Sequence, residues 1–152
     1  MANCGMEIGH SLQNRLAPCP QWGAKGKEYL ALMNLMIALS LLLNIAVLVP
    51  VCGGLMTNAK WAGDAYGDAT PARSILLSMY IAIGSVSLFL LVLHDPKPVA
   101  ALLLVQVIYK LITPLTVGTL ANPVVVSNLC IAAFHVVTLF LIWQGALASS
   151  AS

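Results

Sequence analysis

Residues 99–120 read VAALLLVQVIYKLITPLTVGTL, an apolar stretch with one charged residue, Lys110, near its middle. At about 1.5 Å per helical residue, a stretch of roughly 20 residues crosses the hydrocarbon core of a bilayer, which is about 30 Å thick. A charge at that depth costs roughly 2.5 to 3.5 kcal/mol on insertion scales, so its side chain should face protein, a ligand or trapped water. None of the long apolar stretches of the chain contains an Asp or Glu. We therefore expect a membrane-spanning helix in which the partner of Lys110 comes from outside this chain.

Three further stretches are long and apolar enough to span a membrane: residues 30–51, 74–93 and 124–147. Charged residues make up 8% of the chain and the mean hydropathy is +0.93, whereas about 25% of the residues of a soluble domain are charged. The stretches are uniformly apolar rather than alternating, which favours helices over barrel strands. The sequence thus predicts a single all-α domain over residues 1–152, an integral membrane four-helix bundle with up-down-up-down order.

The segments outside the four spans are polar. Within residues 1–28, Ile8, Leu12 and Leu16 recur at a spacing of four residues, which predicts a short interfacial amphipathic helix on the membrane surface or a docking element for a partner. Residues 53–73 have the composition of a solvated loop. The other two connections are short, so the helices that they join should be antiparallel neighbours.

The distribution of basic residues predicts the orientation, because cytoplasmic connections are enriched in Lys and Arg. Arg15, Lys25, Lys27 and Lys97 fall on one side of a four-helix topology, and Lys60 and Arg73 on the other. Both termini should then lie on the cytoplasmic side of a bacterial inner membrane or an organellar membrane.

The four cysteines are far apart in the sequence and include no close pair of the kind that binds zinc. We expect free thiols and no metal site, with a bridge between Cys4 and Cys19 left open.

Polar residues within two of the spans should share a face of each helix. Gln106, Lys110 and Thr113 follow helical spacing, with Tyr109 on their flank, and Asn128 and His135 do the same on the fourth stretch. They predict an intramembrane polar site or a partner contact.

Three interpretations of Lys110 and His135 remain open. In the first, both residues form hydrogen bonds within the bundle. In the second, they pair with an acidic residue of another subunit, or with a carboxylate or phosphate of a lipid or cofactor. In the third, they belong to a transport or proton-transfer site. His135 is also a candidate ligand for haem or a pigment, since neutral imidazole binds such metals. The candidate contacts are therefore lipid, pigment or quinone, and the sequence identifies no cofactor.

A stripe of small residues on the second stretch would let another helix approach closely. It consists of Ser74, Ser78, Ala82 and Ser85. The sequence does not separate packing inside the bundle from packing against a neighbouring subunit or a second copy of the chain.

No catalytic motif occurs: the chain has no phosphate-cradling glycine loop, no paired metal-binding histidines and no nucleophile elbow. Its few, dispersed basic residues do not suit nucleic acid. The leading hypothesis is a non-catalytic accessory subunit of a larger membrane complex of the respiratory or photosynthetic kind, which contacts other integral membrane subunits and lipids. The alternatives are a small oligomeric transporter or proton/anion conduit that uses Lys110 and His135, and a subunit that holds a pigment, haem or quinone.

Overall fold

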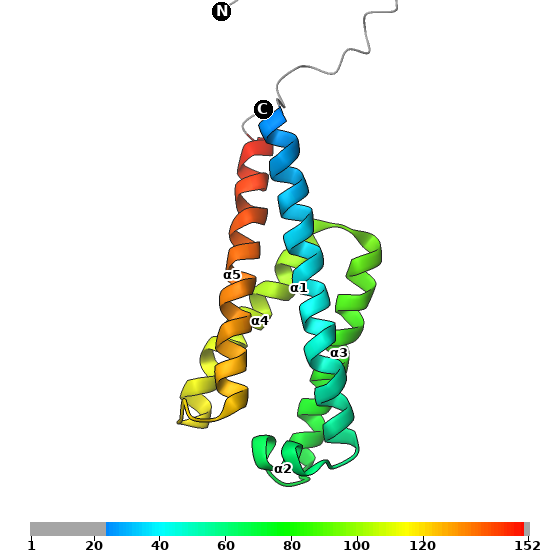
Figure 1. The fold of residues 1–152 in the computed structure, drawn as a ribbon, viewed down its shortest axis with the longest axis vertical. Helices are drawn as coiled ribbons and strands as arrows, with labels where there is room; N and C mark the ends of the chain where they lie inside the picture. The colour runs from blue at the N-terminus through cyan, green and yellow to red at the C-terminus, as the bar shows by residue number, and fades with distance from the viewer. Residues whose placement is uncertain (1–23, 151–152) are drawn as a thin grey trace, which may run out of the picture.

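The computed structural model describes the backbone of residues 24–150 and the side chains of residues 26–147. Within that part the chain forms five helices, listed here in chain order: α1 (Ala24–Met56), α2 (Lys60–Tyr66), α3 (Pro71–Leu93), α4 (Pro96–Val117) and α5 (Pro123–Ser150). The four long ones are apolar enough to cross a membrane, and they run up and down in turn (Figure 1). The predicted all-α four-helix bundle is confirmed, and the chain is a multi-pass membrane protein.

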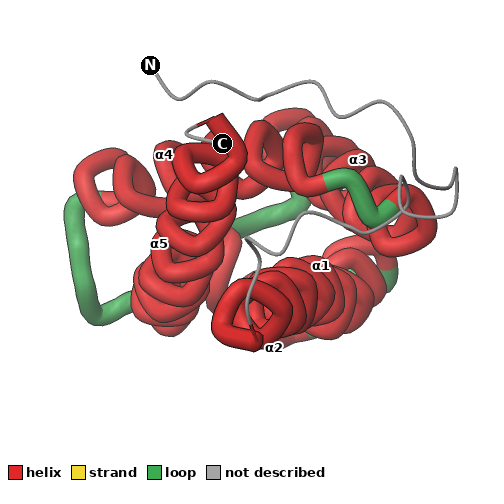
Figure 2. Tube along the Cα trace, turned by 90° about the horizontal axis from the view of Figure 1, so that it is seen from above, coloured by secondary structure: helices red, strands yellow, loops and turns green. Residues whose placement is uncertain are grey.

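The four long helices pack as two pairs. α1 packs along α3, α4 packs along α5, and contacts between α1 and α5 join the pairs. Although a short turn connects α3 and α4, these two helices touch far less than the others, because α4 leaves the turn obliquely, behind α1, toward α5 (Figures 1 and 2). The expectation that a short turn makes close neighbours therefore holds for α4 and α5 and largely fails for α3 and α4.

Two helix boundaries differ from the sequence prediction at α1. This helix begins at Ala24 rather than at residue 30, and it continues through Pro50 to Met56. α1 thus includes the last five residues of the polar segment 1–28, since Lys and Glu extend a helix readily where it leaves the membrane. The predicted interfacial helix around Ile8, Leu12 and Leu16 lies outside the described residues.

The starts of α3 and α4 follow from local capping. The Thr70 hydroxyl accepts a hydrogen bond from the Arg73 amide, and the Asp95 carboxylate accepts one from the Lys97 amide. In each case a proline follows the cap, where its missing N–H is not needed. α4 ends at Gly118, whose φ of 73° favours glycine. These caps place α4 at Pro96–Val117 instead of the predicted 99–120.

The loop predicted over residues 53–73 contains the short helix α2, which lies across one end of the bundle. Ala62 is fully buried there, and the Asn122 side-chain amide donates to the Ala65 carbonyl at 3.1 Å. The Arg73 guanidinium donates to the Gly67 carbonyl at 2.8 Å and to the Asn58 side chain. The Asn122 contact, from 57 residues away, fastens α2 to the bundle, and the Arg73 contacts hold the residues on either side of α2.

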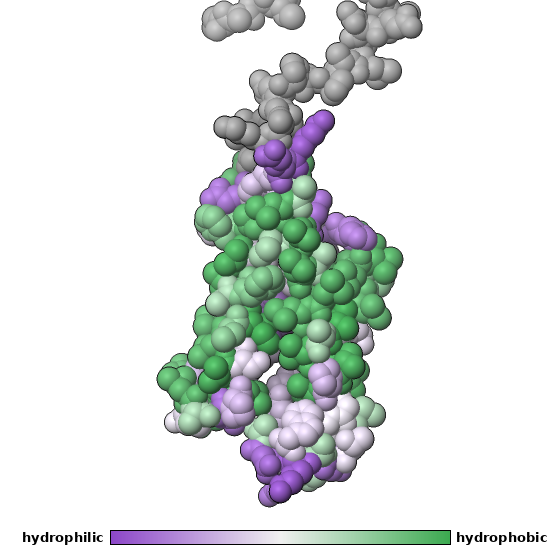
Figure 3. Space-filling model, in the orientation of Figure 1, coloured by the Kyte–Doolittle hydropathy of each residue, from purple (hydrophilic) through white to green (hydrophobic). Residues whose placement is uncertain are grey.

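The outside of the bundle is apolar over its middle and polar at its two ends on the face seen in Figure 3. Large apolar side chains such as Ile75, Leu88 and Leu115 are more than half exposed. This is the pattern expected for a surface that contacts lipid. Inside, toward the termini, an apolar cluster of Met33, Ile37, Leu41, Leu90, Val99 and Leu103 closes the bundle.

Candidate functional site

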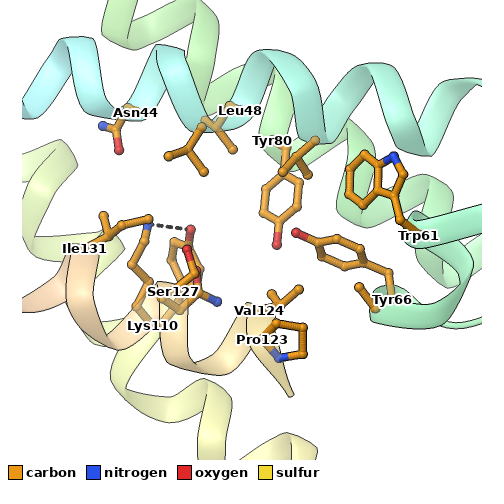
Figure 4. A pocket seen from close by; sticks show the side chains of 15 residues that line it. Asn44, Leu48, Trp61, Tyr66, Tyr80, Lys110, Pro123, Val124, Ser127 and Ile131 are labelled. Atoms are coloured by element: carbon orange, nitrogen blue, oxygen red, sulfur yellow. Dashed lines mark hydrogen bonds between the residues drawn. The ribbon is translucent and has the colours of Figure 1, made fainter. Parts of the chain in front are cut away.

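A cavity of about 220 Å³ lies inside the end of the bundle that α2 covers. All five helices contribute to its wall, and Lys110 on α4 lies at the end of the cavity away from α2, together with Asn44 and Ile131 (Figure 4). The other lining residues are Asn44, Val47, Leu48, Val51, Trp61, Ala65, Tyr66, Tyr80, Tyr109, Pro123, Val124, Ser127, Asn128 and Ile131. Among these described residues, Lys110 alone carries a full charge.

Lys110 is 4% exposed and obtains its hydrogen bonds from its own helix. Its Nζ donates to Gln106 Oε1 at 2.9 Å and to the Tyr109 hydroxyl at 2.8 Å. An ammonium group has three donors, so one donor direction remains for the cavity. The expectation of a partner from outside the chain is therefore corrected in part, because neutral groups of the same helix accept two of the hydrogen bonds of Lys110.

A second cavity of about 550 Å³ adjoins the first and shares several wall residues with it, including Tyr66, Tyr80 and Asn128. It reaches Asp64 on α2 and Thr113 on α4. The rings of Tyr66 and Tyr80 meet edge to face, with centroids 6.1 Å apart. Burial raises the pKa of the Tyr66 phenol above its ordinary value, so this hydroxyl stays neutral at physiological pH. The two cavities therefore lie side by side at the end of the bundle that α2 covers.

A hydrogen-bonded chain of polar residues crosses the bundle beyond the cavity. His135 Nε2 donates to Asn44 Oδ1 at 3.1 Å, and Asn44 Nδ2 donates to Ser87 Oγ at 3.2 Å. The chain thereby ties α5, α1 and α3 together. Nearby, the hydroxyls of Ser40 and Thr138 lie 2.8 Å apart. Each of these side chains is buried, so the bundle interior is polar at several depths.

Two buried polar atoms have no hydrogen-bond partner among the described residues: Gln106 Nε2, a donor, and His135 Nδ1, an acceptor in this tautomer. Gln106 lies eleven residues before the end of α4, and His135 lies twelve residues after the start of α5. On antiparallel neighbours this corresponds to nearly the same depth, about 16–18 Å from the α2 end. Unpaired buried polar groups of this kind often mark sites where water or a ligand binds.

Comparison with known protein families, with curated proteins and with solved structures finds no match to this chain.

The structure brings most of the predicted site residues together. Lys110 donates hydrogen bonds to both Gln106 and Tyr109, and Asn128 lines the same cavity as Tyr109 and Lys110. Thr113 lines the adjoining cavity and donates to the Tyr109 carbonyl at 2.9 Å.

His135 does not line either cavity. It is fully buried, and its Nε2 is occupied by Asn44, so a role as a haem or pigment ligand would require Nδ1 and stays a prediction.

Several site residues were not singled out from the sequence. Asn44 was not among the predicted site residues, yet it both lines the cavity and binds His135. The same holds for Ser87, Tyr66 and Tyr80, none of which was predicted as a site residue. A polar residue in the middle of an apolar span was the available signal for Asn44 and Ser87, but their partners are 43 or more residues away, and pairing at that range is not readable from helical spacing.

The small-residue stripe of α3 faces outward. Ser74, Ser78, Ala82 and Ser85 are all exposed, and Ser78 Oγ donates to the Ser74 carbonyl of the same helix at 3.1 Å. Among the described residues, no three His, Cys, Asp or Glu side chains gather in a way that could hold a metal ion. Cys52 and Cys130 are free thiols, and Cys4 and Cys19 lie outside the described residues.

Trp61 at the cavity mouth depends on a glycine of α1. A Cβ added at Gly54 would lie 2.0 Å from the Trp61 ring, whereas one added at the neighbouring Gly53 would meet nothing within 4 Å. We expect Gly54→Ala to displace Trp61 and to lower the free energy of unfolding by about 1–3 kcal/mol. Gly53→Ala is the matched control and should be neutral or slightly stabilising. Unfolding in detergent checks both, and equal effects would show that Trp61 does not rest on Gly54.

Proposed function

We propose that this protein is a non-catalytic membrane transporter or conduit for protons or small anions, with Lys110 at the inner end of the solute cavity. The cavity itself is the observation that supports this most directly. The cavity lies at the α2 end of the bundle. The one charged side chain in its wall, Lys110, is basic and is 4% exposed. An intramembrane charge that faces a cavity is a frequent mark of a solute or proton path.

Beyond the cavity the proposed path would continue through polar groups. The next polar group along the path would be Gln106, which accepts a hydrogen bond from Lys110. The path would then reach the hydrogen-bonded chain of His135, Asn44 and Ser87. The apolar cluster around Leu41 and Leu103 closes the path toward the termini. A cavity at one end of the bundle, with an apolar cluster between it and the other end, suits a transporter that exposes its site to one side at a time. With both termini cytoplasmic, as the basic residues predict, this state would open to the opposite side.

The test is flux in liposomes that contain the purified full-length protein. We expect uptake of protons or of a small anion, such as chloride or acetate, above the rate of empty liposomes. Lys110→Met should reduce this uptake to background, because a neutral apolar side chain offers no charge to the solute. Lys97→Met is the matched control, since Lys97 is exposed at the start of the same helix, and it should transport like the wild type.

Two results would contradict the proposal. One is wild-type protein that gives no flux above empty liposomes for any of these solutes. The other is undiminished flux in Lys110→Met protein whose folded state has been verified by its thermal unfolding.

The accessory-subunit hypothesis remains as a second candidate, and the outward stripe of α3 favours it. Small residues on an exposed helix face allow a second helix to pack closely, and Ser74, Ser78, Ala82 and Ser85 are exposed. Gentle extraction from the native membrane followed by native mass spectrometry tests it. Co-migration with other subunits would support this role, whether respiratory, photosynthetic or other, whereas a homo-oligomer or monomer would leave transport as the better account.

A further inference from the structure

The walls of the Lys110 cavity are chemically uneven. The inner end has one cation, Lys110, whose Nζ lies toward Asn44 of α1 across the open space (Figure 4). Along the sides, apolar residues dominate, among them Leu48, Val51 and Ile131. A ligand that fills this space must therefore place a charge or a strong acceptor at one end and apolar surface along its length.

The charge at the inner end selects for a monoanion. Lys110 Nζ has one donor direction not used by Gln106 or Tyr109, and the wall of this cavity includes no Asp or Glu. A cation would be repelled there. A phosphate monoester, which carries up to two charges, would leave one uncompensated at low dielectric. A carboxylate carries one charge and accepts strong hydrogen bonds from ammonium groups.

Neutral hydrogen-bond donors complete a carboxylate site. The Tyr109 hydroxyl lies 2.8 Å from Nζ, and Asn44 and Asn128 line the same space. A carboxylate has about four lone-pair sites, which these groups and the ammonium can occupy in part. The apolar wall then accommodates a hydrocarbon body, which gains from leaving water.

The volume limits the size of the body. The cavity measures about 220 Å³, whereas pockets that hold drug-sized ligands measure roughly 300–1,000 Å³. A short acid is therefore the better fit.

We propose that the cavity binds a small monocarboxylic acid with an apolar body, with its carboxylate on Lys110 Nζ and its body against Leu48, Val51 and Ile131. This inference rests on the proposed function, because it names the class of anion that the same cavity would receive. It goes beyond that function in requiring an apolar part of the ligand.

The test compares three probes of equal chain length on the purified full-length protein: hexanoate, hexanol and hexylamine. Binding is measured by calorimetry and by the shift of the thermal unfolding temperature in detergent. We expect saturable binding of hexanoate with a rise in unfolding temperature, weaker or no binding of hexanol, and none of hexylamine. Acetate, which has the charge without the apolar body, should bind more weakly than hexanoate.

Two variants refine the test. Lys110→Met should lose hexanoate binding, whereas Lys97→Met should keep it. Ile131→Phe should also weaken binding, because the larger ring occupies the apolar part of the cavity while Lys110 remains. If Lys110→Met does not fold, the carboxylate site is tested by the three probes on the wild type and by hexanoate binding to Ile131→Phe.

The outcomes separate this inference from the proposed function. Hexanol binding equal to hexanoate, or hexanoate binding unchanged in folded Lys110→Met protein, would overturn the inference. Flux of protons or chloride without hexanoate binding would also overturn it and leave the transport proposal standing. Lys110-dependent hexanoate binding without any flux in liposomes would support the carboxylate site and remove the transport function.

Discussion

Replacing Asn44 by leucine should lower the free energy of unfolding by about 2–4 kcal/mol. Asn44 accepts from His135 Nε2 and donates to Ser87 Oγ, and all three side chains are buried. Leucine has a similar size but no polar atoms, so the histidine N–H would lose its acceptor inside the bundle. Hydrogen bonds between membrane helices contribute about 0.6 kcal/mol each on average. Most of the expected loss of stability therefore comes from leaving the histidine N–H unpaired inside the bundle.

Asn34→Leu provides the matched control for this prediction. Asn34 lies on the same helix, ten residues earlier, and its side chain is exposed. Its replacement should change stability by no more than about 0.5 kcal/mol. Reversible unfolding in mixed detergent measures both variants, and equal losses at the two positions would contradict the role of the chain from His135 to Ser87.

A double variant distinguishes a specific contact from a general packing defect. If Asn44 and His135 act as a pair, Asn44→Leu combined with His135→Leu should cost less than the sum of the single variants, since the second change removes the unpaired group left by the first. Additive losses would show that the two residues stabilise the bundle independently.

The number of spans was predictable because it depends on the length of apolar stretches alone, and residues 74–93 nearly match α3. The helix ends were less predictable. Local hydrogen bonds decide where helices start, as the caps at Thr70 and Asp95 show. Packing against other segments decides the burial of Ala62 in α2. Hydropathy does not register such contacts.

The site was partly predictable for the same reason. Gln106, Tyr109 and Lys110 are close in sequence, and helical spacing alone placed them on one side of α4. The pairing of His135 with Asn44, which are 91 residues apart, depends on how α1 packs against α5. Likewise, the three tyrosines and Trp61 that flank the cavity meet only after α2 folds across the end of the bundle. The sequence therefore indicated the polar groups of α4 and α5 but not the cavity that they line.

Access of water-soluble reagents to the inner end of the cavity is the second large effect that we expect. Ile131 lines the cavity, whereas its neighbour Cys130 is exposed on the outside of α5 at nearly the same depth. A thiol reacts as the thiolate, which forms in contact with water and is disfavoured in lipid. A cysteine at position 131 should therefore react with a charged, membrane-impermeant reagent far faster than Cys130.

The measurement uses full-length protein in liposomes, with Cys4, Cys19 and Cys52 replaced by serine. One variant keeps Cys130, and the other combines Cys130→Ser with Ile131→Cys. A cleavable tag on the N-terminus reports orientation, and a charged methanethiosulfonate reagent is applied to each side separately. Proteins of each orientation are scored for modification.

This measurement is decisive because both the transport function and the carboxylate site require that Lys110 be reached through the cavity from the α2 end. We predict that reagent applied on the side opposite the termini modifies the Ile131→Cys variant. Reagent on the side of the termini should modify it little, and Cys130 should not react from either side. Equal protection of both cysteines from both sides would contradict the account, and so would modification of Ile131→Cys from the side of the termini alone.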